Sequence, residues 1–242
     1  MLAEGLHYST KHPPPRGCFL LNRIIIFANG ELPDLDKARS LLRPDDYILC
    51  ADGGTRHALA LNLMPNLVIG DMDSIDSAEW KKLEEKNIPI ELFSRDKNET
   101  DLELAINKAI EMNPAEIIIF AALGGRMDHT LANIALLSNA YLVTRNVYLD
   151  NGIEQLLFCR DQAEVRGRSG DIVSLIPWGN PVYGIQTENL KWQLKDETLF
   201  PDKTRGISNE MTADTASIKV ASGLLLIIHR RNPYLVPQRI HP

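Results

Sequence analysis

Residues 47–74 read YILCADGGTRHALALNLMPNLVIGDMDS, and this stretch decides the fold class. It opens with an apolar run at residues 47–50, passes through a helical pattern at residues 55–62, and returns to an apolar run at residues 67–69. A short, wholly apolar strand, then an amphipathic helix, then a second such strand is typical of a parallel βαβ unit. Asp- and Gly-rich motifs follow both apolar runs. Because ligands bind at the carboxyl ends of parallel strands, we expect a functional site there.

The same alternation continues on both sides of this unit. Further buried strands are predicted at residues 23–29, 90–93, 116–122 and 146–149, and further helices at residues 34–42, 77–86, 100–112 and 128–140. Wholly apolar strands that alternate with helices indicate an α/β fold, in which a mostly parallel sheet carries helices on both faces.

Helical periodicity nearly vanishes after residue 150. Short strand-like pieces follow at residues 155–159, 171–176, 182–186, 190–194, 217–220 and 223–229. Strands at this spacing predict a smaller all-β sandwich. The first residues include Pro13, Pro14 and Pro15, which oppose regular structure. We therefore divide the chain into a flexible extension at residues 1–20, an α/β domain at residues 21–150 and a β-sandwich domain at residues 151–242.

The composition limits the partners. The formal net charge of −6 disfavours binding to nucleic acid or to an acidic membrane. No stretch is long and apolar enough to span a bilayer. The cysteines Cys18, Cys50 and Cys159 are few and form no CxxC pattern, which fits a reducing cytoplasm. We expect a cytoplasmic protein in which any phosphate ligand binds at a local site, against the negative charge of the protein as a whole.

Two aspartates follow the strand predicted at residues 67–69. Asp71 and Asp73 lie two positions apart and can face one point. If they are about 4 Å apart, their repulsion is roughly 4 kcal/mol at an effective dielectric near 20. A divalent ion with oxygen ligands, such as Mg²⁺, removes this conflict. The alternative is that both are turn-forming residues, because Asp favours turns.

Further polar residues follow the neighbouring strands. Asp101 is a third carboxylate for a metal, although it and Thr100 also suit the start of a helix. Lys97 and Arg126 are candidates to neutralise phosphate oxygens, with a surface ion pair as the alternative for Arg126. Glycine lets a backbone approach a phosphate at a helix start, which makes candidates of Gly53, Gly54 and Gly125.

Taken in order, the motifs resemble those of the thiamine pyrophosphokinase family. They are ADGG at residues 51–54, GDMDS at 70–74, a segment ending in Thr100-Asp101, GGRMDH at 124–129, LKW at 190–192 and GISNE at 206–210. Each motif is weak alone, but six in register are specific, and the resemblance runs from about residue 23 to residue 229.

The resemblance implies a homodimeric transferase that uses ATP and Mg²⁺ to convert thiamine into thiamine diphosphate. It implies that Asp71, Asp73 and Asp101 bind the metal, that Asp52 and its glycines lie at the same site, and that Arg126 and Asp128 border the phosphates. It also implies that thiamine binds between the α/β domain of one subunit and the sandwich of the other, near Trp192, Ser208 and Asn209. Many relatives carry aspartate where this chain has Asn98, which leaves the ligands at that point open.

Two other functions stay open at this point. A nucleotide-sugar glycosyltransferase also uses a DxD motif to hold a metal, but GGRMDH and GISNE are then unexplained. A non-catalytic module that binds thiamine or a nucleotide would bind without turnover.

In the pyrophosphokinase hypothesis, the thiamine hydroxyl attacks the β-phosphorus of ATP in line and AMP leaves, so catalysis depends on positioning and charge stabilisation.

Overall fold

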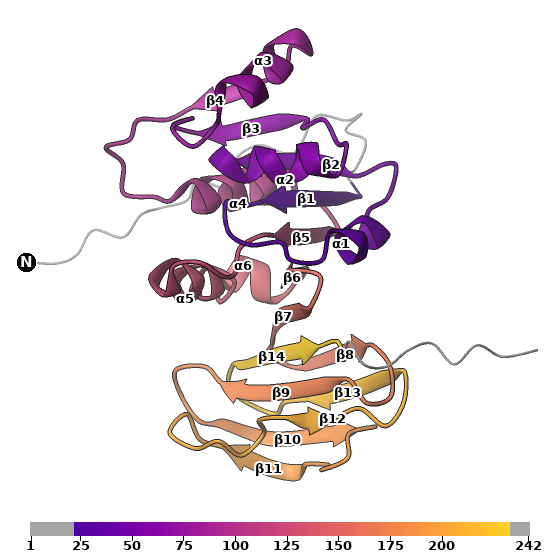
Figure 1. Cartoon of the computed structure of the whole chain (residues 1–242). Coiled ribbons are helices and arrows are strands. Elements are labelled where there is room, and N and C mark those ends of the chain that lie inside the picture. Colours follow the sequence, from indigo (N-terminus) through magenta and orange to yellow (C-terminus); the bar gives the residue numbers. More distant parts are fainter. Residues whose placement is uncertain (1–21, 233–242) are drawn as a thin grey trace, which may run out of the picture.

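The computed structural model describes residues 22–232, whose strands form two sheets (Figure 1). The first is a mixed sheet of ten strands in the order β12-β9-β14-β7-β6-β5-β1-β2-β3-β4, and the second is an antiparallel sheet of four, β11-β10-β13-β8. This arrangement confirms the predicted fold class. The extension predicted at residues 1–20 lies outside the described residues.

The α/β half contains six parallel strands. They are β1 (Arg23–Phe27), β2 (Tyr47–Ala51), β3 (Leu67–Gly70), β4 (Ile90–Leu92), β5 (Glu116–Phe120) and β6 (Asn146–Asp150). The helices between them are α1 (Leu35–Leu41), α2 (Thr55–Ala60), α3 (Ser77–Glu85), α4 (Asp101–Met112), α5 (Met127–Leu136) and α6 (Ala140–Val143), with a 3-10 turn, η1 (Asp52–Gly54), after β2.

Helices cover both faces of these parallel strands. In β1, Ile25 and Phe27 pack in the core that includes residues of α1, α2 and α3, whereas Ile24 and Ile26 pack in the core beneath α4, α5 and α6. Successive side chains of a strand point to opposite faces, so burial on both sides requires a continuous apolar sequence. This explains why the strands show no polar alternation. None of the helices in residues 22–232 is long and apolar enough to cross a membrane.

The β-rich half contains the remaining strands. They are β7 (Glu154–Cys159), β8 (Gln162–Arg166), β9 (Ile172–Pro177), β10 (Val182–Glu188), β11 (Lys195–Leu199), β12 (Asn209–Glu210), β13 (Thr215–Lys219) and β14 (Leu225–Arg230). Strands β7, β14, β9 and β12 extend the large sheet, and the small sheet packs against them through a separate core in which Leu225 and Ile227 meet Val165 and Ile218.

The two halves share one sheet, which the sequence did not reveal. Strand β7 pairs antiparallel with β6, so that Asp150 lies opposite Gln155. The turn between them is formed by Asn151, whose Oδ1 accepts hydrogen bonds from the backbone N–H groups of Ile153 and Glu154. Backbone hydrogen bonds therefore run across the point where the sequence pattern changes, and our division at residues 150 and 151 remains a proposal about domains.

The expectation of a strand at residues 190–194 is wrong. Leu190 forms only an isolated bridge with Met211, and the next strand, β11, begins at Lys195. The buried side chain of Asn209 forms hydrogen bonds with both backbone groups of Trp192. Its Oδ1 accepts from the N–H at 3.0 Å, and its Nδ2 donates to the carbonyl at 2.7 Å. A loop stabilised by one side chain replaces the predicted strand.

Candidate active site at the carboxyl edge of the parallel strands

Three carboxylates converge where β2 and β3 end and α4 begins. Asp52 follows β2, Asp71 follows β3, and Asp101 is the first residue of α4. One oxygen from each lies within 4.8 Å of the others; Asp52 is buried and the other two are half-buried. We call these three residues the acidic cluster. It brings together Asp71 and Asp101, both predicted as metal ligands, and adds Asp52, which was predicted only to lie nearby.

Gly70 allows this close approach. A Cβ at this position would lie 2.9 Å from the Cβ of Asp52 and 3.1 Å from Oδ1 of Asp101. Two residues near this contact between Gly70 and the carboxylates have left-handed backbone conformations, with φ of 46° at Asp52 and 63° at Met72. Such conformations are unfavourable for residues other than glycine and cluster at functional sites. The local backbone is therefore arranged around the carboxylates.

The acidic cluster carries surplus negative charge. Burial raises the pKa of Asp101, the ion pair with Lys97 lowers it, and the charges of Asp52 and Asp71 raise it again. Lys97 Nζ lies 3.0 Å from Oδ1 of Asp101 and 3.9 Å from Oδ2 of Asp71. One ammonium group thus pairs with two of the three carboxylates.

The donor set suits a hard divalent cation. Oδ1 of Asp101 is buried and, among the described residues, accepts no hydrogen bond of good geometry, even with Lys97 nearby. A buried acceptor without a donor is costly, and a cation relieves that cost. Oxygen-only ligands with high negative charge are what Mg²⁺ prefers.

The carboxylate of Asp73 is not one of the three that converge, although its backbone N–H donates to Oδ1 of Asp71 at 3.2 Å. The Asp73 carboxylate is paired with Arg95 and accepts a hydrogen bond from the Ser74 hydroxyl at 3.0 Å. The hydrogen bond from Ser74 lowers the pKa of Asp73 most, and the pairing with Arg95 lowers it further. Arg95 also approaches Asp71, with 3.8 Å between Nε and Oδ2. The metal-binding role of Asp73 stays a prediction, and Arg95 is a basic residue of this site that the sequence analysis did not single out.

The glycines after β2 have a packing role. A Cβ on Gly54 would lie 2.0 Å from the carbonyl oxygen of Phe27, and one on Gly53 would lie 2.6 Å from the side chain of Asn29. Thr55 Oγ1 donates a hydrogen bond to the carbonyl of Asp52 at 2.9 Å. These contacts hold the turn that presents Asp52.

The glycines after β5 lie before α5 and contact a residue that sequence analysis missed. The N–H of Gly125, whose φ is 67°, donates to Glu31 Oε1 at 3.1 Å. A Cβ at Gly124 would lie 2.6 Å from the Glu31 carboxylate. An anion therefore occupies this glycine turn, which is the behaviour expected of backbone N–H groups at a helix start. A lone Glu in a loop gave no signal in the sequence.

Arg126 and Asp128 are exposed and bind each other. Arg126 Nε donates to Oδ1 of Asp128 at 3.1 Å, and Nη2 donates to Oδ2 at 2.5 Å. This bidentate pair lowers the pKa of Asp128.

Thr100 caps α4, because its hydroxyl accepts from the N–H of Glu103 at 3.2 Å. The alternatives weighed for Arg126 and Thr100, a surface ion pair and a helix cap, both occur in the structure.

The candidate thiamine residues lie in the β-rich half, away from the acidic cluster (Figure 1). The side chain of Trp192 is half exposed, and Lys191 Nζ lies 5.0 Å from its ring centroid. Ser208 has a left-handed backbone with φ of 58°, and its N–H donates to Ser174 Oγ at 3.0 Å. Asn209 is buried and fixes the backbone of Trp192. Among these three residues, Trp192 and Ser208 are exposed and Asn209 is buried.

Known proteins share both halves of this chain. The family model "Thiamin pyrophosphokinase, catalytic domain" matches residues 38–169, and "Thiamin pyrophosphokinase, vitamin B1 binding domain" matches residues 161–225. The chain is 28% identical to thiamine pyrophosphokinase of Bacillus subtilis, covering 73% of this chain and 84% of that protein. It is 26% identical to thiamine pyrophosphokinase 1 of Oryza sativa, over 93% of each.

A solved structure has the same fold. The crystal structure of thiamine pyrophosphokinase from Bacillus subtilis superposes with a TM-score of 0.79 at 24% identity, and the match covers 87% of this chain and all of that one. The family models match well over half of the sequence, in the order that the six motifs predicted. The chain therefore belongs to the thiamine pyrophosphokinase family.

Proposed function

We propose that this protein transfers the diphosphate of ATP to the hydroxyl group of thiamine, which gives thiamine diphosphate and AMP. Its family supports this reaction. The acidic cluster is the observation that carries the proposal for this chain, because three carboxylates within 4.8 Å of one another need a counter-charge. The exposed, charged edge at which they lie is where α/β proteins bind nucleotides.

Asp52, Asp71 and Asp101 would hold Mg²⁺, and Asp73 would join them once Arg95 releases it. Bound there, the ion would supply charge neutralisation for the triphosphate. Lys97 already lies between Asp71 and Asp101, so it is placed to turn from a carboxylate to a phosphate oxygen. Either Asp71 or Asp101 would accept the proton of the thiamine hydroxyl.

The glycine turn before α5 would bind phosphate oxygens of ATP. The N–H of Gly125 already donates to the Glu31 carboxylate, which a phosphate would displace. Arg126 would exchange Asp128 for a phosphate, because a guanidinium fork fits both groups in the same bidentate way. Asp128 would then be free to bind substrate.

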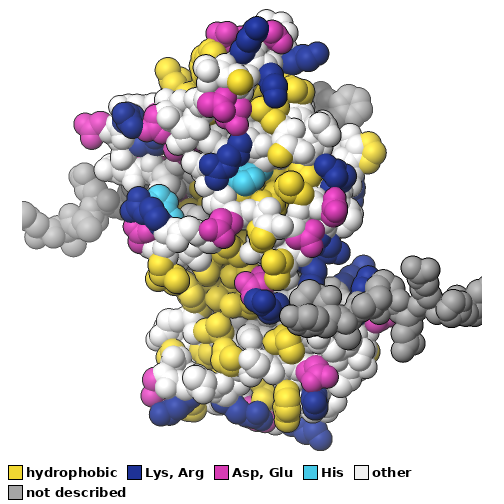
Figure 2. All heavy atoms as spheres, in the orientation of Figure 1, with side chains coloured by type: hydrophobic (Ala, Val, Ile, Leu, Met, Phe, Trp, Pro, Cys, Tyr) yellow, Lys and Arg dark blue, Asp and Glu magenta, His cyan; other side chains and the backbone are white. Residues whose placement is uncertain are grey.

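A homodimer would complete the site. Trp192, Ser208 and Asn209 lie in the half of the molecule that does not carry the acidic cluster, so thiamine bound to them would meet ATP held by a partner subunit (Figure 1). Apolar side chains gather at the waist of the molecule between the two halves (Figure 2). On α5 and α6, Met127, Leu131 and Tyr141 are more than half exposed, which supports burial against a second copy. We also propose that the protein acts in the cytoplasm.

The test is the identity of the products. Purified full chain incubated with ATP, thiamine and Mg²⁺ should release AMP and thiamine diphosphate in equal amounts, as measured by chromatography. Omission of thiamine is the control and should leave ATP intact. Formation of ADP instead of AMP, or binding of both substrates without turnover, would overturn the proposal.

A further inference from the structure

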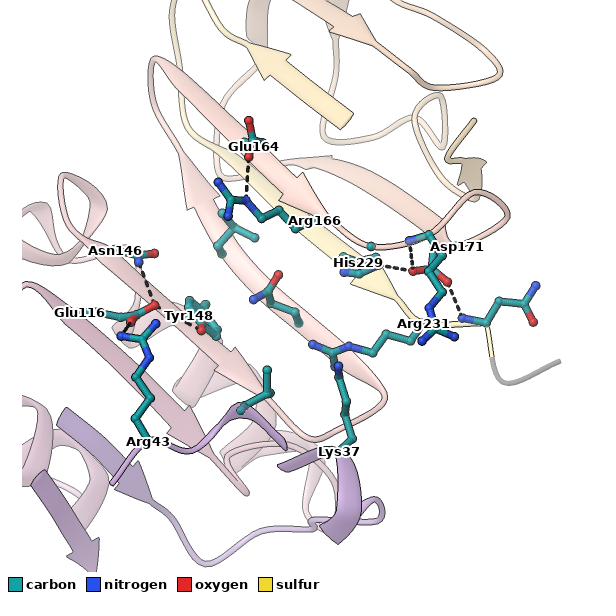
Figure 3. A pocket seen from close by; sticks show the side chains of 16 residues that line it. Lys37, Arg43, Glu116, Asn146, Tyr148, Glu164, Arg166, Asp171, His229 and Arg231 are labelled. Carbon is teal, nitrogen blue, oxygen red and sulfur yellow. Dashed lines mark hydrogen bonds and ion pairs between the residues drawn. The ribbon is translucent and has the colours of Figure 1, made fainter. Parts of the chain in front are cut away.

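A cavity of about 830 Å³ lies where the two halves of the molecule meet (Figure 3). Glu116 and Asn146, which line it, are the first residues of β5 and β6. The acidic cluster lies at the opposite, carboxyl ends of the parallel strands. The cavity is therefore separate from the candidate active site.

The cavity lies where the elements packed on one face of the large sheet change from a helix to the small sheet. Helix α1 packs on the α/β side of this face, and the small sheet packs on the other side through Leu225 and Ile227. Between the two covers, the strands carry polar side chains. Asp150 of β6 lies opposite Gln155 of β7, which lies opposite His229 of β14. Polar residues on three neighbouring strands interrupt an otherwise apolar face.

The cavity lining carries more positive than negative charge. Its charged residues are the cations Lys37, Arg43, Arg166, Arg168 and Arg231 and the carboxylates Glu116, Glu164 and Asp171. Each of these carboxylates already pairs with a neighbouring side chain. Glu116 is 3.5 Å from Arg43, Glu164 is 2.8 Å from Arg166, and Asp171 is 2.9 Å from His229 Nε2. Arg231 binds Asp150, a buried carboxylate beneath the cavity, at 2.6 Å.

Lys37 and Arg168 are left without an anionic partner. Within residues 22–232, neither side chain makes an ion pair or a hydrogen bond. Burial lowers the pKa of Lys37, and the neighbouring charges of Arg231 and Arg168 lower it further, while the charges of Asp150 and Asp34 raise it. Figure 3 shows Lys37 of α1 and Arg231 extending into the same part of the cavity. Three cations thus lie near one another in a protein whose net charge is −6, and only Arg231 among them forms an ion pair within residues 22–232.

We propose that Lys37, Arg168 and Arg231 form a binding site for a small, multiply charged oxyanion of the phosphate class. These residues come from α1, from the loop after β8 and from the end of β14. An anion bound by all three therefore links the α/β half to the β-rich half and stabilises their junction. Guanidinium and ammonium groups that converge on one point are the donors that such anions require.

The experiment measures binding of inorganic phosphate to the full chain by isothermal titration calorimetry, in EDTA and 150 mM NaCl, about physiological ionic strength. Without a metal ion, the negative charge of the acidic cluster repels phosphate. Any phosphate bound at that site should be unaffected by substitutions in the cavity. We expect saturable binding and a rise in melting temperature with phosphate. Lys37→Gln and Arg168→Gln should each weaken phosphate binding about tenfold or more, since each removes one charge-assisted contact.

The matched control is Arg160→Gln, which removes an exposed arginine between β7 and β8 outside the cavity lining. It should bind phosphate as the unchanged protein does. A parallel titration with citrate distinguishes a phosphate site from a general polycarboxylate site, and tighter citrate binding would overturn the phosphate class. Equal weakening by Arg160→Gln, or no saturable binding, would overturn the site itself. A cooperative melting transition without phosphate shows that each variant is folded, and the rise with phosphate should shrink in Lys37→Gln and Arg168→Gln.

Discussion

The acidic cluster and the cationic cavity both leave charge unbalanced, but with opposite sign. In the acidic cluster, Lys97 pairs with Asp71 and Asp101, while Asp52 adds a third carboxylate. In the cationic cavity, Arg231 pairs with Asp150, and the charges of Arg231 and Arg168 both act on Lys37. Elsewhere in the described chain, pairs such as Lys191 with Glu210 lie at the surface, where ion pairs contribute little. In both places, a cluster of one sign that the fold holds together indicates a ligand of the opposite charge.

The largest expected effect is on turnover. Asp71→Asn removes a carboxylate from the acidic cluster and should lower the rate of AMP formation about 1000-fold, because metal-assisted charge stabilisation contributes several kcal/mol. Steady-state assays at saturating Mg²⁺ would measure it. Asp45→Asn, at an exposed aspartate outside the cluster, is the control and should keep the normal rate.

The same assay separates Asp52 from Asp73. The structure places Asp52 in the acidic cluster and pairs Asp73 with Arg95, so Asp52→Asn should reduce turnover more than Asp73→Asn. The reverse order would show that Asp73 replaces Asp52 when the metal binds.

The next effect is on stability at the cationic cavity. Arg231→Gln leaves the carboxylate of Asp150, which is fully buried, without its partner. Loss of one member of a buried ion pair costs about 3 kcal/mol or more. Urea unfolding should show this decrease, while Arg160→Gln should change the free energy of unfolding little. A decrease below about 1 kcal/mol would mean that Lys37 replaces Arg231 beside Asp150.

Two lysines should respond in opposite directions. In the absence of Mg²⁺ and phosphate, Lys97→Gln removes the counter-charge of the acidic cluster and should lower the free energy of unfolding by up to about 1 kcal/mol. Lys37→Gln relieves crowding with Arg231 and Arg168 and should leave stability unchanged or slightly higher. Each variant serves as the control for the other in the same denaturation experiment. A loss in both would contradict the unbalanced charge at the cavity.

The smallest effect concerns pH. Burial lowers the pKa of His229, while its hydrogen bond to Asp171 and the charge of Asp150 raise it and Arg231 lowers it. The folded state therefore favours neutral His229, whose Nδ1 has no hydrogen-bond partner among the described residues. This stability is present above the ordinary histidine pKa of about 6.5 and is lost as the pH falls through the lower pKa of the folded state.

His229→Gln should flatten the decrease in stability between pH 7 and pH 5, as measured by denaturation at each pH. The exposed His129 provides the control, and His129→Gln should keep the slope of the unchanged protein. An unchanged slope in His229→Gln would contradict this account.

The sequence by itself determined the parallel sheet and one edge of it. Wholly apolar runs such as residues 23–27 indicate burial on both faces, because side chains alternate between the faces of a strand. Parallel strands all end at the same edge, so Asp52 and Asp71, which follow neighbouring strands, were predicted to meet. Local patterns are sufficient for such conclusions since they concern adjacent residues in the chain.

Tertiary structure alone decided what depends on contacts between distant residues. The pairing of β6 with β7, the placement of Asp52 rather than Asp73 beside Asp101, and the Glu31 contact with Gly125 have no local signature. The cationic cavity joins Lys37 to Arg168 and Arg231, which lie more than a hundred residues further along the chain. Such neighbours are chosen by packing and long-range pairing, because side chains far apart in sequence interact only after the backbone has brought them together.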